Sequence, residues 1–378
     1  SDNSSYTIPE DVQLIESYTF YHAENLNEVT FPSPVEFASG SVFEESDNVE
    51  KIHGPNVYED GKRLIHNGLL TYVAPKGLVN YTTPPGVTKL SYGVFDSKLE
   101  LETVVLSDEV EAVGSAIPCR PYSIPLGYIL WDCPNLKSVT VSANMRILGM
   151  DPFGGDIYSK AKNLGTVYMR ALIPPVIGHN QPDLIPSLFE NLTIYVPQTS
   201  LQAYKASPDW APYRNYLKGY DYTDLPVNDV YVSVDYSMDG DVVTLQQASK
   251  GNGIDIVLMG DAYSDRQVTN GYYKHDMELL YDNLFAEEPY KSFKDYFNVY
   301  YVNVVSATEG YEFGNTALDT WFGDGTEVGG SDQSVFEYAL KAITEERMDE
   351  AMLVVAMNSD AYAGTCYMYY PKYYTDYG

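Results

Sequence analysis

The feature that most constrains the fold is an internal repeat in the first half of the chain. Residues 20–32 align without gaps on residues 43–55, and the same frame returns at 95–107, 130–142 and 158–170. A unit of this length cannot bury its apolar face alone and must stack on its neighbours. The sequence therefore predicts a stacked solenoid for this half of the chain rather than a single globular core.

Every copy of the repeat has the same apolar frame. A large apolar residue comes first, a second apolar residue follows six positions later, and a β-branched residue then opens a short alternating run. The second apolar position holds Leu26, Val49, Leu101, Leu136 and Leu164, and the β-branched position holds Val29, Ile52, Val104, Val139 and Val167. We expect one short strand per copy, with these side chains facing inward. Asparagines, which cap turns well, precede four of the strands at Asn25, Asn48, Asn135 and Asn163.

The spacing between copies is irregular. Successive copies lie 23, 52, 35 and 28 residues apart. The longest gap predicts a degenerate copy within residues 64–90, which read as short strands broken by proline and glycine. Two departures, Gly54 at an inward position and the insertion of residues 108–129, predict an uneven curvature.

A family resemblance follows from these motifs. The run Ile8-Pro9-Glu10-Asp11-Val12, followed by Asn25-Leu26 and Val29-Thr30-Phe31-Pro32, resembles the BspA-type leucine-rich repeat of bacterial surface proteins. The segment from Leu192 through Trp210 is similar to the usual end of such arrays in Bacteroidetes. The resemblance implies an irregular, mostly β leucine-rich-repeat domain at residues 1–220. It also implies that the repeats bind an extracellular protein or glycan ligand.

The remainder of the chain has the pattern of an α/β domain. We expect residues 221–251 to form a linker with a short strand at 230–234, and residues 252–378 to form the domain itself. Strand-like runs at 254–259, 296–305 and 351–357 alternate with helical patterns at 266–287 and 332–346. This alternation predicts a parallel sheet, so the overall fold class is α/β.

Polar residues follow two of these predicted strands. Asp261, Ser264 and Asp265 follow the first strand, and Asn358 and Asp360 follow the third. Ligand sites in parallel sheets lie beyond the carboxyl ends of the strands, and carboxylates and amides are hard oxygen ligands for cations. The residues are therefore candidate ligands at the strand ends. The alternative is that they serve turns and helix caps.

Several separated motifs in this region resemble the IgA-peptidase-type zinc metallopeptidases, metallopeptidase family 64. They are Ile254-Asp255-Ile256-Val257, Gly260-Asp261-Ala262-Tyr263-Ser264, Tyr296-Phe297-Asn298-Val299 and Thr316-Ala317-Leu318-Asp319. The resemblance implies a partial zincin-like α/β domain and a zinc cofactor in the full-length family member. Members of that family bind zinc through His-Glu-x-x-His, two imidazoles one helical turn apart with a glutamate general base between them.

The zinc-binding motif is absent from these 378 residues. The five histidines are His22, His53, His66, His179 and His275, and none has the required partner. We therefore assign no catalytic and no metal residue, interpret His275 as a solvated helix residue, and expect this chain to be inactive by itself. Three cysteines, Cys119, Cys133 and Cys366, form no disulfide or zinc-site pattern and are expected to be buried thiols.

Charge and hydropathy exclude some partners. A net charge of −30 and a pI near 4.3 oppose binding to nucleic acid or anionic lipid. No apolar run reaches the length of a membrane span. We expect a secreted or cell-surface protein whose signal or lipoprotein segment has been removed.

Three functional hypotheses remain open at this stage. The first is the front of a surface metallopeptidase with His-Glu-x-x-His shortly beyond Gly378, and the second is a complete non-enzymatic adhesion or ligand-binding protein. The third is a cation-dependent binding domain centred on Asp261. An unfinished sheet also predicts an exposed apolar face around residues 351–357.

Overall fold

A computed structural model describes residues 4–37, 40–58, 60–91, 93–113, 130, 133–150, 152–153, 163–178, 191–225, 230–310, 316–322 and 328–359. The chain divides into two compact units. Unit 1 comprises Ser1–Leu201 and Pro212–Val227, and unit 2 comprises Gln202–Ala211 and Asn228–Gly378. Each unit is described by itself below.

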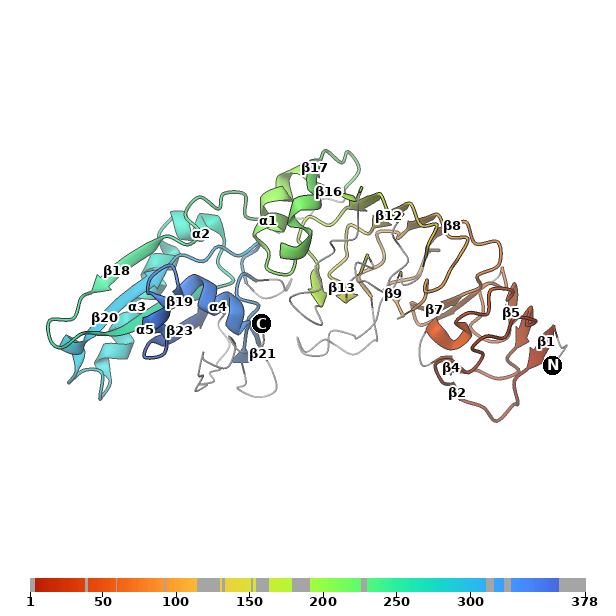
Figure 1. The fold of residues 1–378 in the computed structure, drawn as a ribbon, viewed down its shortest axis with the longest axis horizontal. Coiled ribbons are helices and arrows are strands. Elements are labelled where there is room, and N and C mark those ends of the chain that lie inside the picture. The colour runs from red at the N-terminus through yellow and green to blue at the C-terminus, as the bar shows by residue number, and fades with distance from the viewer. Residues whose placement is uncertain are drawn as a thin grey trace. The chain divides into compact units, whose positions relative to one another are not determined.

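Unit 1 consists of short strands stacked in parallel sheets (Figure 1). A three-stranded sheet contains β1 (Ser5–Thr7), β3 (Glu28–Thr30) and β5 (Lys51–His53). A six-stranded sheet then runs through β8 (Asn80–Thr82), β10 (Thr103–Val105), β12 (Ser138–Val141), β14 (Thr166–Met169), β16 (Thr193–Pro197) and β17 (Leu217–Tyr220). All neighbouring strands of these two sheets are parallel.

The remaining strands of unit 1 form two further sheets. The larger contains β6 (Arg63–His66), β7 (Leu69–Val73), β9 (Lys89–Leu90), β11 (Ala112–Val113), β13 (Ile147–Met150) and β15 (Val176–Gly178), of which only the β6–β7 pair is antiparallel. The smaller pairs β2 (Leu14–Ile15) with β4 (Glu36–Phe37). The short helices η1 (Gly40–Phe43), η3 (Gln198–Ser200) and η4 (Ala211–Tyr216) complete this part of the chain, whereas α1 (Leu201–Ala206) belongs mostly to unit 2.

The strand register confirms the repeat frame. Val29 pairs with Ile52, Val104 with Val139, and Val139 with Val167, which are the β-branched positions of successive copies. The degenerate copy predicted within residues 64–90 is also present. Its strand β8 lies beside β10 in the six-stranded sheet, with Tyr81 opposite Val104. A mostly parallel, strand-rich repeat region is therefore what the sequence predicted.

The inward positions of the repeat form the core of unit 1. The five apolar and five β-branched residues of the frame are all buried. The asparagines link neighbouring copies, because the Nδ2 atoms of Asn48, Asn135 and Asn163 donate to the carbonyl oxygens of Glu24, Leu99 and Pro134 at 2.5–2.7 Å. Cys133 is buried as predicted, and its thiol donates to the carbonyl of Phe95; Cys119 and Cys366 lie outside the described residues.

Gly54 departs from the repeat frame for a steric reason. Its φ angle is 140°, and a Cβ at this position would lie 2.3 Å from the carbonyl oxygen of Phe31. The preceding strand therefore occupies the volume that an apolar side chain would need. Only glycine fits where two neighbouring copies approach this closely.

Unit 2 contains a four-stranded sheet with helices. Its main elements are β18 (Val242–Gln246), β19 (Ile254–Asp261), α2 (Asp265–Thr269), α3 (Tyr272–Ala286), η5 (Lys294–Tyr296), β20 (Phe297–Val302), α4 (Asp332–Ala339), α5 (Glu345–Met348) and β23 (Met352–Met357). A separate two-stranded antiparallel sheet pairs β21 (Trp321–Phe322) with β22 (Val328–Gly329). The strand order is β18-β20-β19-β23, and β19 is parallel to both of its neighbours (Figure 1). The predicted parallel α/β sheet is therefore confirmed.

Alternate residues of β19 divide the core of unit 2 into two layers. Ile256 and Leu258 pack with residues of α2 and α3, whereas Val257 and Met259 pack with residues of α4 and α5. Because successive strand side chains point to opposite faces, these contacts place one helical layer on each face of the sheet. This arrangement leaves the carboxyl ends of the strands as the edge where the connecting loops meet.

Three local predictions differ from the structure. The helix predicted at 332–346 is two short helices, α4 and α5, which residues 340–344 separate. The predicted helix at 266–287 is two helices, because Asn270 and Gly271 interrupt it and Gly271 has a φ of 86°. The strand predicted at 230–234 is an extended segment outside any sheet, whereas β18, later in the predicted linker, pairs antiparallel with β20. The side chain of Asp265 holds the extended segment in place, as described below.

Candidate functional site

The structure brings four of the five candidate ligand residues together at the carboxyl end of β19. Asp261 is the last residue of the strand, and Ser264 and Asp265 begin α2. Asn358, which follows β23, reaches the same place because Asp261 is opposite Met357 in the parallel register. The Nδ2 atom of Asn358 donates to the carbonyl oxygen of Ala262 at 2.9 Å. Asp360 lies outside the described residues.

The carboxylate of Asp261 is the centre of a buried hydrogen-bond network. Asp261 has no exposed surface. Its Oδ1 atom accepts from the backbone N–H groups of Ala262 and Leu318 and from the hydroxyl of Ser306, at 2.9–3.1 Å. Its Oδ2 atom accepts from the hydroxyls of Thr316 and Thr320 and from the N–H of Thr320, at 2.5–3.1 Å. A carboxylate has about four lone-pair positions, so these donors occupy its accepting capacity.

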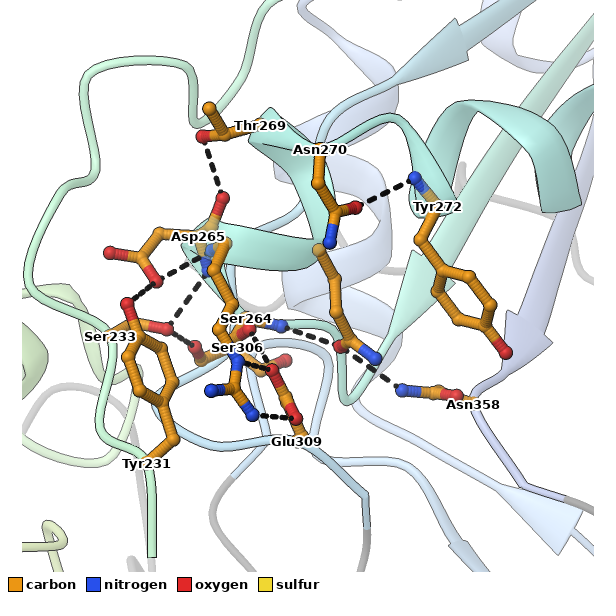
Figure 2. A network of polar contacts seen from close by, with 12 residues as sticks. Tyr231, Ser233, Ser264, Asp265, Thr269, Asn270, Tyr272, Ser306, Glu309 and Asn358 are labelled. Atoms are coloured by element: carbon orange, nitrogen blue, oxygen red, sulfur yellow. Dashed lines mark hydrogen bonds and ion pairs between the residues drawn. The ribbon is translucent and has the colours of Figure 1, made fainter.

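Ser264 takes part in a second, more exposed network (Figure 2). Its hydroxyl donates to Oε1 of Glu309 at 2.7 Å, and its backbone N–H donates to the side chain of Gln267 at 3.1 Å. The guanidinium of Arg266 forms an ion pair with both carboxylate oxygens of Glu309, and its Cζ atom lies 4.2 Å from the ring centroid of Tyr231.

The pKa of Glu309 follows from these contacts. The hydrogen bond from Arg266 lowers it, partial burial opposes that effect, and the hydrogen bond from Ser264 lowers it further. The net result is a pKa below the ordinary glutamate value. Glu309 is therefore held as a carboxylate at neutral pH, with Arg266 as its counter-ion.

Asp265 anchors the extended segment before β18 (Figure 2). One carboxylate oxygen accepts from the hydroxyl of Tyr231 at 2.6 Å, and the other accepts from the N–H groups of Val234 and Asp235 at 2.8–2.9 Å. The backbone N–H of Asp265 donates to the hydroxyl of Ser233 at 3.1 Å. Burial and the hydrogen bond to Asp265 raise the pKa of Tyr231 to about 12, so this phenol remains a donor at neutral pH.

Every predicted ligand residue that the structure describes thus has hydrogen-bond partners within the protein. The ligand role of these side chains stays a prediction. Their partners at Ser306, Thr316, Thr320 and Glu309 were not identified from the sequence as site residues. Apart from the adjacent N–H of Ala262, the donors to Asp261 lie 45–59 residues along the chain from it and share no local spacing, so only the folded loops bring them together.

The described residues do not fit a zinc ion. Among them, no group of three or more His, Cys, Asp or Glu side chains is arranged to hold a metal. His275 is exposed on α3, as the sequence predicted, and lies one residue before Asp276, which accepts from the hydroxyl of Tyr263. No helix within the described part of the chain is long and apolar enough to span a bilayer.

These features define a two-part protein in which parallel repeats accompany an α/β sheet with a polar carboxyl edge. Residues 1–117 match the family model of the BspA type leucine rich repeat region in six copies, and residues 243–375 match the model of IgA Peptidase M64. The chain therefore carries a BspA-type leucine-rich-repeat region and an IgA peptidase M64 domain. Strands β12, β14, β16 and β17 continue the six-stranded sheet beyond the matched residues, and β13 and β15 continue the second sheet.

The solved structures that resemble part of this chain include bacterial leucine-rich-repeat proteins. One is a leucine rich cell surface protein of Faecalibacterium prausnitzii, at 16% identity over 58% of this chain and 60% of that one, with a TM-score of 0.36. Others come from Treponema pallidum (18% identity, 47% of this chain and 74% of that chain, TM-score 0.27) and Eubacterium ventriosum (16%, 51% and 54%, TM-score 0.29). The chain thus spans 60% of the length of the first of these proteins. No curated protein matches it.

Proposed function

We propose that this chain is part of a secreted or cell-surface metallopeptidase of the IgA-peptidase type, whose leucine-rich repeats bind an extracellular protein or glycan. The observation that carries the proposal is the match of residues 243–375 to the M64 family, on a domain with a parallel sheet. Parallel sheets position ligands at the carboxyl ends of their strands. The repeats support a binding role because a stacked array offers an extended surface.

The proposal assigns the domain's chemistry to peptide-bond hydrolysis and expects zinc in the full-length family member. It also holds that this 378-residue polypeptide alone is inactive, because its five histidines include no pair one helical turn apart with an intervening glutamate. Within the described residues, the chain contributes the sheet and the hydrogen-bonded loops at its carboxyl edge. The Asp261 network fixes the loop that contains residues 316–320 against the end of β19.

The gene provides the first test. A His-Glu-x-x-His motif encoded within about a hundred codons after Gly378 supports the proposal, and a stop codon directly after Gly378 contradicts it. If the motif is present, the longer product is expressed beside the 378-residue chain and both are assayed for zinc-dependent peptidase activity.

The activity assay has a matched control. The proposal expects hydrolysis by the longer product only, and loss of that hydrolysis when the motif glutamate is replaced by glutamine. Replacing the exposed Glu278 of α3 by glutamine is the control and should leave activity unchanged. Zinc-dependent activity in the purified 378-residue chain contradicts the statement that it is inactive by itself.

A further inference from the structure

Three adjacent strands of unit 1 present tyrosine rings on the same side of the repeat sheet. Tyr168 in β14 is directly opposite Tyr195 in β16, and Tyr220 ends the neighbouring strand β17. Val167 and Ile194, the strand neighbours of the first two, are buried on the other side. Because strand side chains alternate, the tyrosines lie on the face opposite the core. We call Tyr168, Tyr195, Tyr220 and the following Tyr222 the tyrosine cluster.

The rings of the tyrosine cluster touch one another. The rings of Tyr168 and Tyr195 are stacked, with centroids 5.4 Å apart and planes 17° from parallel. Tyr220 contacts both edge to face, at centroid distances of 6.0 and 5.6 Å. The ring of Tyr222 lies 4.7 Å from that of Tyr220. The cluster is a continuous aromatic surface, and Tyr220 leaves 44% of its area exposed.

Polar contacts hold the cluster in place without any ligand. The hydroxyl of Tyr222 donates to the carbonyl oxygen of Tyr195 at 3.2 Å, and the guanidinium of Arg170 lies 5.9 Å from the Tyr222 ring centroid. Arg170 in turn forms ion pairs with Asp108 and Asp224 at 2.9 and 3.0 Å. A surface whose rings are already ordered loses little conformational entropy when a ligand binds.

Most strand positions around the cluster carry hydroxyls or amides rather than charges. Along the same face of the six-stranded sheet, one row of side chains in register consists of Asn80, Thr103, Ser138, Thr166 and Thr193. The adjacent row continues from Tyr168 and Tyr195 to Thr140 on one side and Lys218 on the other. Of the outward-facing residues on these six strands, only Lys218 is charged. The strand positions of this face thus contribute almost none of the net charge of −30 that the chain carries.

We propose that the tyrosine cluster binds a neutral polysaccharide, with pyranose rings stacked on the tyrosines and sugar hydroxyls bound by the threonine and serine row. A pyranose presents a face of C–H bonds that packs on an aromatic ring, and its hydroxyls pair with neutral donors and acceptors. This proposal rests on the proposed binding role of the repeats and names the ligand class.

Charge favours a neutral polysaccharide over an anionic polymer and over a basic protein segment. An anionic polymer is repelled by the chain's net charge. A basic protein segment would need several free carboxylates beside the rings, but Asp108 and Asp224 are already paired with Arg170, and Asp221 between Tyr220 and Tyr222 is a single exposed carboxylate. A neutral polysaccharide is not repelled by the net charge and needs no free carboxylates, and its hydroxyls match the hydroxyl-rich face.

The test is affinity electrophoresis and calorimetry of the whole 378-residue chain. The probes are four soluble neutral polysaccharides (xyloglucan, galactomannan, mixed-linkage β-glucan and amylopectin), with polygalacturonate as the anionic comparison. We expect retardation by at least one neutral polysaccharide and none by polygalacturonate. The double substitution Tyr168→Ala and Tyr195→Ala should weaken the binding at least about tenfold, because two stacking surfaces are lost.

The controls separate binding from folding and from the broader proposal. Tyr21→Ala, at an exposed tyrosine of the first repeats, should leave binding unchanged, and Tyr195→Phe, which keeps the ring, should retain most of it. Equal thermal unfolding of the variants establishes that the fold is intact. No retardation by any neutral polysaccharide overturns the inference, as does binding that survives the double substitution. The peptidase proposal is tested by the gene sequence and by the activity assay. Its failure can therefore be distinguished from a failure of the polysaccharide-binding inference.

Discussion

Substituting Asp261 by asparagine tests whether this carboxylate is a structural centre or a cation ligand. The change keeps the size of the side chain but replaces one accepting oxygen with an NH2 group. Either Oδ1 or Oδ2 must be lost, and each accepts three hydrogen bonds in a fully buried position. Three donors would then face another donor.

The expected cost follows from the number and burial of these contacts. A hydrogen bond to a charged group contributes about 1.5–3 kcal/mol, so three would suggest about 5–9 kcal/mol if nothing relaxed. The hydroxyls of Ser306, Thr316 and Thr320 can rotate toward other acceptors, which reduces this sum. The backbone N–H groups cannot rotate away, and each buried donor left without an acceptor costs about 1–3 kcal/mol, so we expect Asp261→Asn to lower the free energy of unfolding by about 3–5 kcal/mol. A domain of this size loses about 2–4 °C of melting temperature per kcal/mol, so unit 2 should melt roughly 10 °C lower.

The assay is thermal and urea unfolding, with and without excess calcium. Hydrogen exchange of the peptide that covers residues 316–322 reports the Asp261 contacts directly, and its amides should exchange faster in the variant. The matched control is Asp295→Asn, since Asp295 is 56% exposed and pairs only with Lys250 in the contacts described. An exposed pair contributes about 0–1 kcal/mol, so this control should unfold almost as the unmodified chain does.

The opposite outcome would identify a ligand site. If Asp261 binds a cation, calcium at 100 times its dissociation constant would stabilise the unmodified chain by about 2.7 kcal/mol and leave the variant unchanged. Without calcium, the variant would then be as stable as the unmodified chain or more so, since a buried charge has been removed. Either result refutes the structural interpretation.

Two further predictions concern the repeats and the pH dependence of unit 2. Gly54→Ala should destabilise unit 1 by about 2–4 kcal/mol in urea unfolding, because the new Cβ would clash with the carbonyl of Phe31. The control is Gly77→Ala, which has a φ of 73° and no atom within 4 Å of the new Cβ, and it should cost only about 1 kcal/mol. Equal losses of stability in the two variants would contradict the steric argument. The hydrogen bond from Arg266 is the main cause of the lowered pKa of Glu309. Glu309 therefore stabilises the folded chain above its ordinary pKa of 4.5, and this stabilisation is lost as the pH falls through the lower pKa of the folded state. The melting temperature of the unmodified chain should therefore fall more steeply below pH 4.5 than that of Glu309→Gln, and parallel acid limbs would contradict this.

The sequence predicted the repeat region well because the interactions there are local. Each copy packs on the copies next to it, so residues at the same position of neighbouring copies pair in the sheet. Val139 and Val167, which are 28 residues apart in the sequence, are paired in this way. The same logic recovered the degenerate copy at β8. Gly54 shows the limit, because its reason is the backbone of Phe31, which no apolar pattern reveals.

The site in unit 2 was predictable only in part. Alternating strands and helices identified the carboxyl end of β19, and parallel pairing brought Asn358 to it. The partners of Asp261 were not predictable, since Ser306 and Thr320 reach it from loops whose paths depend on tertiary packing. The helix break at Gly271 was missed because Tyr273 and Met277 keep helical spacing within α3 alone.

The helical layers of unit 2 partly cover strand β23, whose apolar side chains the sequence predicted to be exposed. The sequence predicted an open apolar face at residues 351–357, yet Leu353 and Val355 pack against one helical layer, and Met352 and Val354 against the other. All six residues of the strand are nevertheless only half-buried. In the described sheet β23 pairs with β19 alone, so a backbone edge accompanies these half-buried apolar side chains. An edge of this kind is satisfied by another strand, and what pairs with β23 therefore decides how this end of the sheet is closed.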